Sequence, residues 1–234
     1  GDRKGVLIGL FDGSTPKVPA NGCFNDYCVD RMRVDLNGDG KLDEKTEDFL
    51  MSRVLSFADG LWDIATDSGC SNFTMAPGSR PAGTLALNCN LKDKTAAGAI
   101  VADLVSDAGY AIRYDSSRSP SITAPAGMYR MLNGRITAAD SNGSIWAAAF
   151  ALPDTFEIKA GAGASLKMGS PLKLEPHPHD RLRLGIKACI SPTITGIAGE
   201  TYDNIAPKDT RMTPFTTISD LEGIVVSEGR MDYG

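Results

Sequence analysis

The chain has 234 residues, a hydrophobic content of 42% and a formal charge of -5 at pH 7. This length allows one large or two small domains with a buried core, and the composition is that of a soluble globular protein. The acidic balance, without a Lys/Arg cluster among aromatic residues, argues against nucleic acid as a partner. No basic amphipathic helix is evident, and no stretch approaches the roughly eighteen apolar residues of a membrane span. We therefore expect no membrane span in this chain.

Short apolar runs predict the first extended segments. Residues 6–11 form an apolar run that ends at an Asp-Gly pair, which predicts a buried strand. Residues 29–34 are also expected to be extended and to lead directly into an acidic loop.

The acidic loop runs from Asp35 to Asp43 with the sequence Asp-Leu-Asn-Gly-Asp-Gly-Lys-Leu-Asp. Oxygen-bearing side chains occupy relative positions one, three, five and nine, and Gly40 at position six supplies the sharp turn that lets the Lys41 carbonyl join them. Ca²⁺ takes roughly six to eight oxygen ligands in a tolerant geometry, whereas Zn²⁺ prefers the His or Cys that this loop lacks. The register therefore favours a calcium site over the alternative of a charged Asn-Gly and Asp-Gly turn that binds nothing.

This loop resembles the calcium loop of EF-hand and dockerin proteins over about a dozen residues. The resemblance implies a set of oxygen ligands for one calcium ion: Asp35, Asn37, Asp39, the Lys41 carbonyl and Asp43. The family closes its site with a bidentate acid at position twelve, where this chain has Thr46. We assign the closing role to Glu47 after a one-residue shift, and a weaker site that ends at Thr46 is the alternative.

Two helices are predicted from apolar side chains at helical spacing. Residues 44–66 predict a long amphipathic helix after the loop, interrupted by Gly60, which indicates close packing or a kink. Residues 94–106 predict a second helix between strands at residues 84–87 and 110–114. Its apolar face would comprise Ala97, Ile100, Val101, Leu104 and Val105.

Beyond the Ser- and Pro-rich residues 115–125, the pattern changes to β. The candidate strands are residues 128–132, 135–138, 145–152, 155–159, 171–174, 182–188 and 223–227. Asn133-Gly134 predicts a hairpin turn between the first two. The Gly-rich residues 161–170 lack the spacing of a phosphate-binding loop and are interpreted as a flexible turn.

These elements predict an α+β fold. Residues 1–114 would form a helix-containing calcium-loop region, with the long amphipathic helix after the loop. Residues 122–234 would form a largely antiparallel β-rich region, as one sheet or a sandwich, and the two regions would pack as one unit.

The five cysteines show no paired metal-binding spacing: Cys23, Cys28, Cys70, Cys89 and Cys189. We favour disulfides between Cys23 and Cys28 and between Cys70 and Cys89, although five reduced thiols are equally compatible with the odd count. Weak calcium sites and disulfides both suit an extracellular, cell-surface or periplasmic location.

Catalytic signatures are weak. Both histidines lie between residues 175 and 180, where flanking prolines favour an exposed rigid linker over a metal-chelating pair. No nucleophile motif is present, and nothing selects two of the 29 acidic residues as a catalytic pair.

We therefore favour a calcium-stabilised structural or adhesion protein of the cell surface or extracellular space. We favour a non-enzymatic role over an enzymatic one. A pilin-like or filament subunit ectodomain is one form of this hypothesis, with other protein subunits or glycans as partners. The alternative is a secreted carbohydrate-active enzyme or carbohydrate-binding module with a structural calcium, in which Tyr129 or Trp146 would line a cleft.

Overall fold

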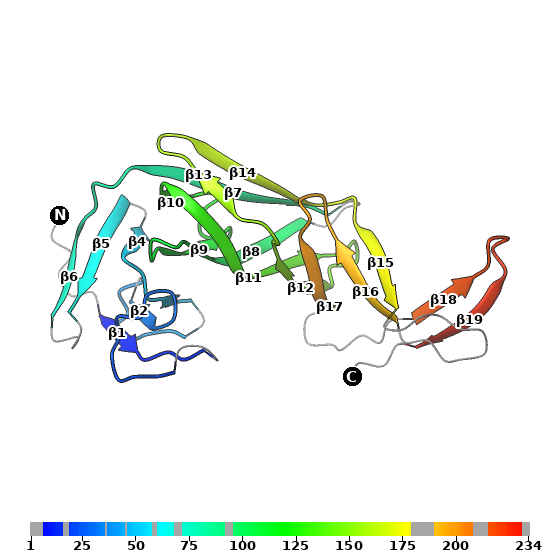
Figure 1. The fold of residues 1–234 in the computed structure, drawn as a ribbon, viewed down its shortest axis with the longest axis horizontal. Coiled ribbons are helices and arrows are strands. Elements are labelled where there is room, and N and C mark those ends of the chain that lie inside the picture. The colour runs from blue at the N-terminus through cyan, green and yellow to red at the C-terminus, as the bar shows by residue number, and fades with distance from the viewer. Residues whose placement is uncertain are drawn as a thin grey trace.

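The computed structural model describes residues 7–15, 19–35, 37–44, 46–57, 60–67, 72–91, 96–178, 190–207 and 215–230. Within these residues every regular element is a β-strand, so the fold is all-β and the predicted α+β class is wrong. The strands run from an N-terminal region through two central sheets to a C-terminal hairpin (Figure 1).

The N-terminal strands form two small antiparallel sheets, in the orders β1-β2-β3 and β4-β5-β6. Their bounds are β1 (Ile8–Phe11), β2 (Arg31–Val34), β3 (Asp48–Leu50), β4 (Val54–Phe57), β5 (Gly60–Thr66) and β6 (Phe73–Pro77). A separate apolar core holds them together, formed by Met32, Val34, Met51, Leu55 and Ile64. This part of the chain therefore has a hydrophobic cluster of its own.

Two larger sheets form the centre of the molecule. The smaller one has the order β10-β7-β14 and consists of β7 (Ala82–Asn90), β10 (Ile122–Pro125) and β14 (Gly163–Gly169). The larger one has the order β15-β16-β17-β12-β11-β8-β9, with β13 paired to β11. Its strands are β8 (Ala96–Val105), β9 (Ala111–Asp115), β11 (Gly127–Ala139), β12 (Ile145–Ala151), β13 (Phe156–Ile158), β15 (Lys173–Pro178), β16 (Ile190–Thr195) and β17 (Thr201–Pro207).

The main core lies between these two sheets. Leu85 and Leu87 of β7 belong to the same buried cluster as Ile100 and Leu104 of β8 and Tyr129 of β11. Because successive side chains of a strand point to opposite faces, each sheet contributes alternate residues to this layer. Strands from both sides of residues 115–121 pair directly, since β7 pairs with β10 and β14 and β8 pairs with β11.

The helix predicted over residues 44–66 is replaced by β3, β4 and β5. Its apolar residues come from separate strands, and Phe57 of β4 pairs with Gly60 of β5. Gly60 has a φ of 132°, which is incompatible with a helix and is readily adopted only by glycine. The Asp-Gly pair at residues 59–60 was thus a turn signal inside what resembled a helical period.

The helix predicted over residues 94–106 is also wrong, because residues 96–105 form β8. Ile100, Ala102 and Leu104 are buried, while Val101 and Asp103 are only partly covered, which is the alternation of a strand. The apolar residues satisfied both a period of two and a period of 3.6. Pairing with β9 and β11 decided between them.

The hairpin turn predicted at Asn133-Gly134 does not form. Both residues lie inside the continuous strand β11, next to an irregularity in its pairing with β8. A side chain at Gly134 would come within 2.6 Å of the Phe150 ring, so this glycine provides room for an aromatic ring on β12. A local turn signal here marks a close packing contact instead.

Several predicted strands are present with shifted ends, among them β1, β2, β7, β9, β12 and β13. The Gly-rich segment is not a simple turn, because most of it forms β14, which pairs with β7 in parallel. The strand predicted at residues 182–188 lies outside the described residues. No helix long and apolar enough to cross a membrane is present in the part of the chain that the structure describes.

The last two strands form a separate two-stranded sheet, β18 (Phe215–Ser219) and β19 (Val225–Arg230). The turn between them is held by Asp220, whose N–H donates to the Ile224 carbonyl at 2.9 Å. This hairpin extends away from the central sheets (Figure 1).

We predict that Leu104→Ala lowers the free energy of unfolding by about 2–5 kcal/mol, because Leu104 is fully buried between the central sheets. Leu132→Ala, at a side chain that is 38% exposed, is the matched control and should change it by less than about 0.5 kcal/mol. Urea denaturation followed by the fluorescence of the two tryptophans measures both. Equal effects of the two substitutions would contradict the assignment of the core.

Candidate metal-binding loop

The acidic loop connects β2 and β3, which form an antiparallel pair with Arg33 opposite Asp48. The Val34 N–H donates to the Glu47 carbonyl at 3.0 Å, so the hairpin continues to the base of the loop. Gly38 and Gly40 have φ values of 75° and 77°, with open space where a Cβ would stand. The loop therefore turns at the glycines, and it is followed by a strand where a helix was predicted.

Asp35 is the centre of the first half of the loop. Its Oδ1 accepts hydrogen bonds from the N–H groups of Gly38 at 2.7 Å and Asp39 at 3.2 Å, and its Oδ2 accepts one from Gly40 at 2.9 Å. The residue is 5% exposed. A nearly buried carboxylate is thus satisfied by the backbone that wraps around it.

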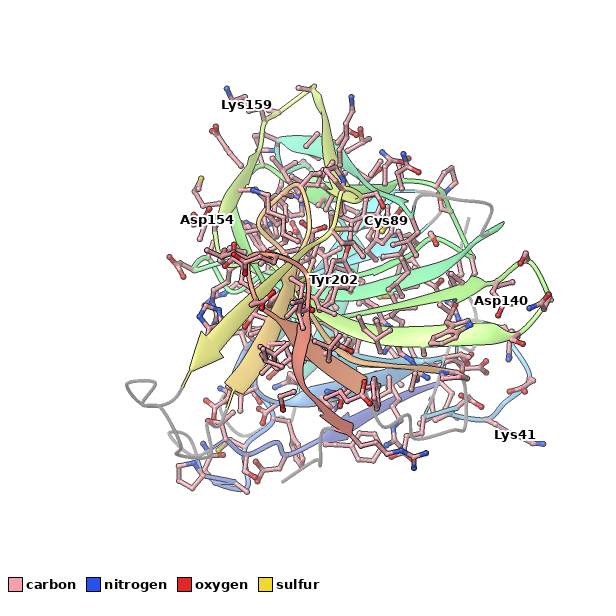
Figure 2. The ribbon with its side chains drawn as sticks, turned by 90° about the vertical axis from the view of Figure 1, so that its right-hand side faces the viewer. Lys41, Cys89, Asp140, Asp154, Lys159 and Tyr202 are labelled. Atoms are coloured by element: carbon pink, nitrogen blue, oxygen red, sulfur yellow. The ribbon has the colours of Figure 1, made fainter. Side chains whose placement is uncertain are left out.

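The next polar side chains make short-range bonds within the loop. Asn37 Oδ1 accepts from the Asp39 N–H at 2.8 Å, and Asp39 Oδ1 accepts from the Lys41 N–H at 2.9 Å. Such Asx turns bring successive side-chain oxygens to the inner side of a loop. The Lys41 side chain lies at the outer tip, away from the body (Figure 2).

Glu47 closes the loop from its far end. Its Oε1 accepts from the Asn37 N–H at 3.3 Å and its Oε2 from the Asp43 N–H at 3.0 Å, while the residue is 1% exposed. Thr46 instead places its Oγ1 3.1 Å from Asp43 Oδ1. The carboxylate that reaches back across the loop is therefore Glu47, one residue beyond position twelve.

Arginines surround the base of the loop without entering it. Arg33 contacts Glu44 at 2.7 Å and Asp48 at 3.3 Å. Arg118, from the turn after β9, donates to the Thr46 carbonyl at 2.9 Å, and Arg113 of β9 donates to the Asp48 carbonyl at 2.8 Å. Arg118 and Arg113 thereby fasten the segment around the loop to the central sheets.

The donor set suits a hard cation, because the loop side chains that accept hydrogen bonds from its backbone do so through oxygen atoms. No group of three or more His, Cys, Asp or Glu side chains in the described residues stands in an arrangement ready to hold a metal ion. The structure thus brings Asp35 and Glu47 to opposite ends of one loop, while Asp39 and Asp43 are engaged with neighbouring N–H groups.

The described cysteines are free thiols: Cys23, Cys28 and Cys89. The predicted disulfide between Cys23 and Cys28 is therefore absent from the structure. Cys28 sits in a turn with a φ of 67°, and its Sγ lies 3.8 Å from the Tyr110 carbonyl oxygen of the central body. Cys70, the predicted partner of Cys89, lies outside the described residues, as do the fifth cysteine, Cys189, and His179.

A buried carboxylate that the sequence did not reveal lies in the turn between β16 and β17. Glu200 is fully buried, and its Oε1 accepts from the Gly169 N–H at 2.6 Å and the Tyr202 hydroxyl at 2.8 Å. Its Oε2 accepts from the Ala198 N–H at 2.9 Å. Cys89 Sγ lies 3.7 Å from the same hydroxyl (Figure 2). The carboxylate therefore ties this turn to the end of β14, and burial raises the pKa of both Tyr202 and Cys89.

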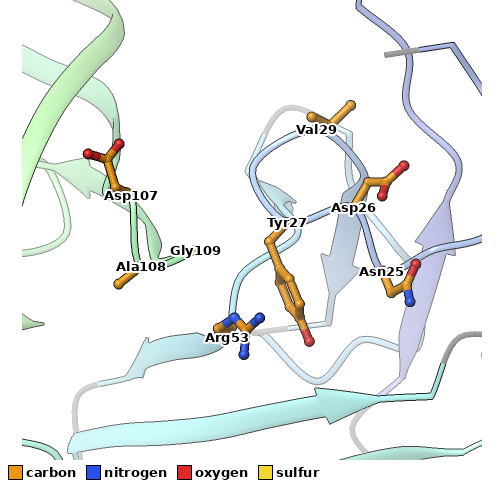
Figure 3. Close-up of a pocket in the computed structure, with 8 residues that line it drawn as sticks. All are labelled: Asn25, Asp26, Tyr27, Val29, Arg53, Asp107, Ala108 and Gly109. Carbon is orange, nitrogen blue, oxygen red and sulfur yellow. The ribbon is translucent and has the colours of Figure 1, made fainter.

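Cavities on the surface of the described residues include two that bear on a ligand-binding role. The smaller has a volume of about 450 Å³ and lies beside Tyr27, whose ring centroid is 4.5 Å from the Arg53 guanidinium carbon (Figure 3). Asp26 and Asp107 line its opposite sides. The larger has a volume of about 690 Å³ and lies beside β7, β8 and β14, with no Asp or Glu in its lining. The larger cavity thus lacks the acid pair that glycoside hydrolysis needs.

The aromatic residues proposed to line a cleft do not do so. Tyr129 is 1% exposed and donates its hydroxyl to the Pro125 carbonyl at 2.9 Å. Trp146 is partly covered and donates its Nε1–H to Asp140 at 3.1 Å. Neither residue lines either cavity.

Comparison of the chain with protein-family models, with curated proteins and with solved structures found no match.

We predict that Cys89 reacts slowly with iodoacetamide in the folded protein. Burial raises its pKa above the ordinary value of a thiol, so at pH 8 the reactive thiolate is depleted relative to the unfolded chain. Peptide mapping after timed alkylation should show a rate at least several-fold below that in urea, with the difference shrinking as the pH rises. Equal rates at pH 8 would contradict the buried environment of this thiol.

Proposed function

We propose that this protein is a calcium-stabilised structural or adhesion protein of the cell surface or extracellular space, such as a filament subunit. The observation that carries the proposal is the Glu47 carboxylate, which reaches back over an oxygen-lined loop whose other end is the nearly buried Asp35. A loop of this kind offers a hard dication several oxygens within a single turn of chain.

The proposed ligands combine side-chain and backbone oxygens: Asp35, Asn37, Asp39, the Lys41 carbonyl, Asp43 and Glu47. Each of these side chains accepts at least one hydrogen bond from a backbone N–H group of this segment, and Asp35 and Glu47 accept through both carboxylate oxygens. A carboxylate has more acceptor positions than these bonds use, so it can bind an ion without releasing the backbone. A bound Ca²⁺ would supply charge neutralisation and would take no part in a reaction.

Repulsion among the carboxylates gives the ion its structural effect. Asp35, Asp39, Asp43 and Glu47 carry like charges within thirteen residues, and their mutual repulsion disfavours the closed loop. An ion that binds only the folded loop stabilises it by mass action, by about 2.7 kcal/mol at a concentration one hundred times its dissociation constant. Through Arg118 and Arg113 this order would extend to the central sheets.

A β-rich chain with one acidic loop suits a location where calcium is abundant. Sites of modest affinity bind at the high calcium concentrations of extracellular fluids. The free thiols of the described cysteines do not contribute to this argument, so the location rests on the loop alone.

We predict that excess calcium raises the melting temperature by several degrees relative to excess chelator. The stabilisation of about 2–3 kcal/mol corresponds to roughly 5–10 °C in a chain of this size. Asp39→Asn together with Glu47→Gln should abolish the shift. Differential scanning calorimetry measures it.

Asp154→Asn with Glu157→Gln is the matched control, because both residues are exposed on the central body and the charge change is the same. This control should keep the full calcium shift. An equal melting temperature of the unaltered protein with calcium and with chelator would remove the proposed role of the loop.

A further inference from the structure

The C-terminal hairpin exposes an unusual amount of apolar surface. Every side chain that the structure describes in β18, β19 and their turn is exposed. Six of these are large and apolar, at exposures of 41% to 102%: Phe215, Ile218, Leu221, Ile224, Val225 and Val226. An isolated two-stranded hairpin is marginally stable in water, and a cluster of exposed apolar residues marks an interaction surface. The hairpin therefore requires a cover that the described residues do not provide.

The smaller central sheet, β10-β7-β14, has an incompletely covered edge that could receive such a hairpin. Strand β10 covers β7 only from Ala82 to Leu85, so no strand among the described residues lies beside residues 86–90 on that edge. The Thr84 N–H and the Asn90 carbonyl both bond toward the β14 side. Because alternate residues direct their backbone groups to opposite sides, those of Leu87 and Cys89 point toward the uncovered edge.

The backbone groups at this edge are largely open among the described residues. The Leu87 carbonyl lies 3.3 Å from the Tyr114 hydroxyl, whereas no bond from a described residue reaches the N–H of Leu87 or either backbone group of Cys89. Strand β8 faces the same space with Gly98, which lies beyond the last pairing of β8 with β9 at Val101. An added strand would find unused donors and acceptors there.

The 690 Å³ cavity is this space, and we call it the edge slot. Its apolar lining includes Leu87, Ile100, Met168 and Ile197, and its one charged lining residue is Lys167. Its uncovered edge is five residues long, or about 17 Å at about 3.3 Å per residue. The five residues of β18 have the same length.

We propose that the C-terminal hairpin of one copy of this chain docks in the edge slot of a second copy and adds a strand to the β10-β7-β14 sheet. The hairpin and the edge slot match in length and in apolar character, and both have strand edges with open backbone groups. The charges are also complementary, because the hairpin carries Asp220, Glu222 and Glu228 against Arg230, whereas the slot carries Lys167.

This contact joins two different surfaces, so it is head-to-tail. Each docked copy still presents a free hairpin at one end and a free slot at the other, and repetition gives an open filament unless the rotation closes a ring. The inference rests on the proposed structural role, and it names the second copy of the chain as the partner, without dependence on the metal.

Two variants separate the two surfaces. Ile218→Asp with Val226→Asp places charges on the exposed hairpin, and Met128→Asp with Ile145→Asp is its control on exposed apolar residues of the body. Ser117→Glu with Lys167→Glu makes the rim of the slot acidic, and Ser144→Glu with Lys159→Glu is its control at exposed positions elsewhere. All substituted side chains are exposed or partly exposed, so the sheets should fold normally.

Sedimentation velocity over a concentration series tests the proposal. The unaltered chain and both controls should reach masses above twice that of the monomer, and each surface variant alone should associate at least about a hundredfold more weakly. A mixture of the two surface variants should form dimers and nothing larger, because the intact hairpin of one fits the intact slot of the other. That dimer also shows that both variants are folded.

Three results would each overturn the docking. They are a monomeric unaltered chain, a slot variant that self-associates like the unaltered chain, and a mixture that stays monomeric. Sedimentation and calorimetry, each run with calcium and with chelator, separate the two proposals. A melting temperature that ignores calcium while assembly persists rejects the loop's role only, and a calcium shift in a strictly monomeric chain rejects the docking only.

Discussion

The structure depends on the packing of β7 against β8 and β11. Leu85 and Leu87 enter the same core as Ile100, Leu104 and Tyr129, and this layer holds the two central sheets together. Burial of side chains of this size contributes about 1.5–3 kcal/mol each relative to exposure, more than any surface ion pair in the molecule. Because β7 also pairs with β10 and β14, its position in this layer fixes where these three strands, which are distant in sequence, come together.

The acidic loop depends on this frame only through its base. Its inner geometry comes from bonds that span at most ten residues, such as those of Asp35 to Gly38 and Gly40 and that of Glu47 to Asn37. For this reason the turn at Gly40 could be predicted from the sequence, while the ligand role of the side-chain oxygens stays a prediction. The strand that follows could not, because its partners β2 and β9 lie elsewhere and the apolar spacing of residues 44–66 also fits a helix.

The same distinction explains the other differences from prediction. Residues 96–105 satisfy two periods, and only pairing with β9 and β11 selects the strand. Asn133-Gly134 is a strong local turn signal, yet the Phe150 ring requires the glycine in the middle of β11. Parallel pairing of β14 with β7 joins residues almost eighty apart, and Glu200 is buried by Gly169 and Tyr202. Local patterns contain no information on such contacts.

Uncovered strand edges are the feature on which the proposed assembly depends. A soluble β-protein normally protects its edges with charge, proline or a bulge. The outer strand β15 follows this rule with Pro176 and Pro178. Strand β18 of the hairpin carries neither charge nor proline, and no described strand covers the edge of β7 beyond Leu85. Unprotected edges at two separate places on one chain favour aggregation unless they fit each other. Mutual fit turns this liability into directed assembly, and a calcium loop that stiffens the opposite end would then set how rigid each repeat is.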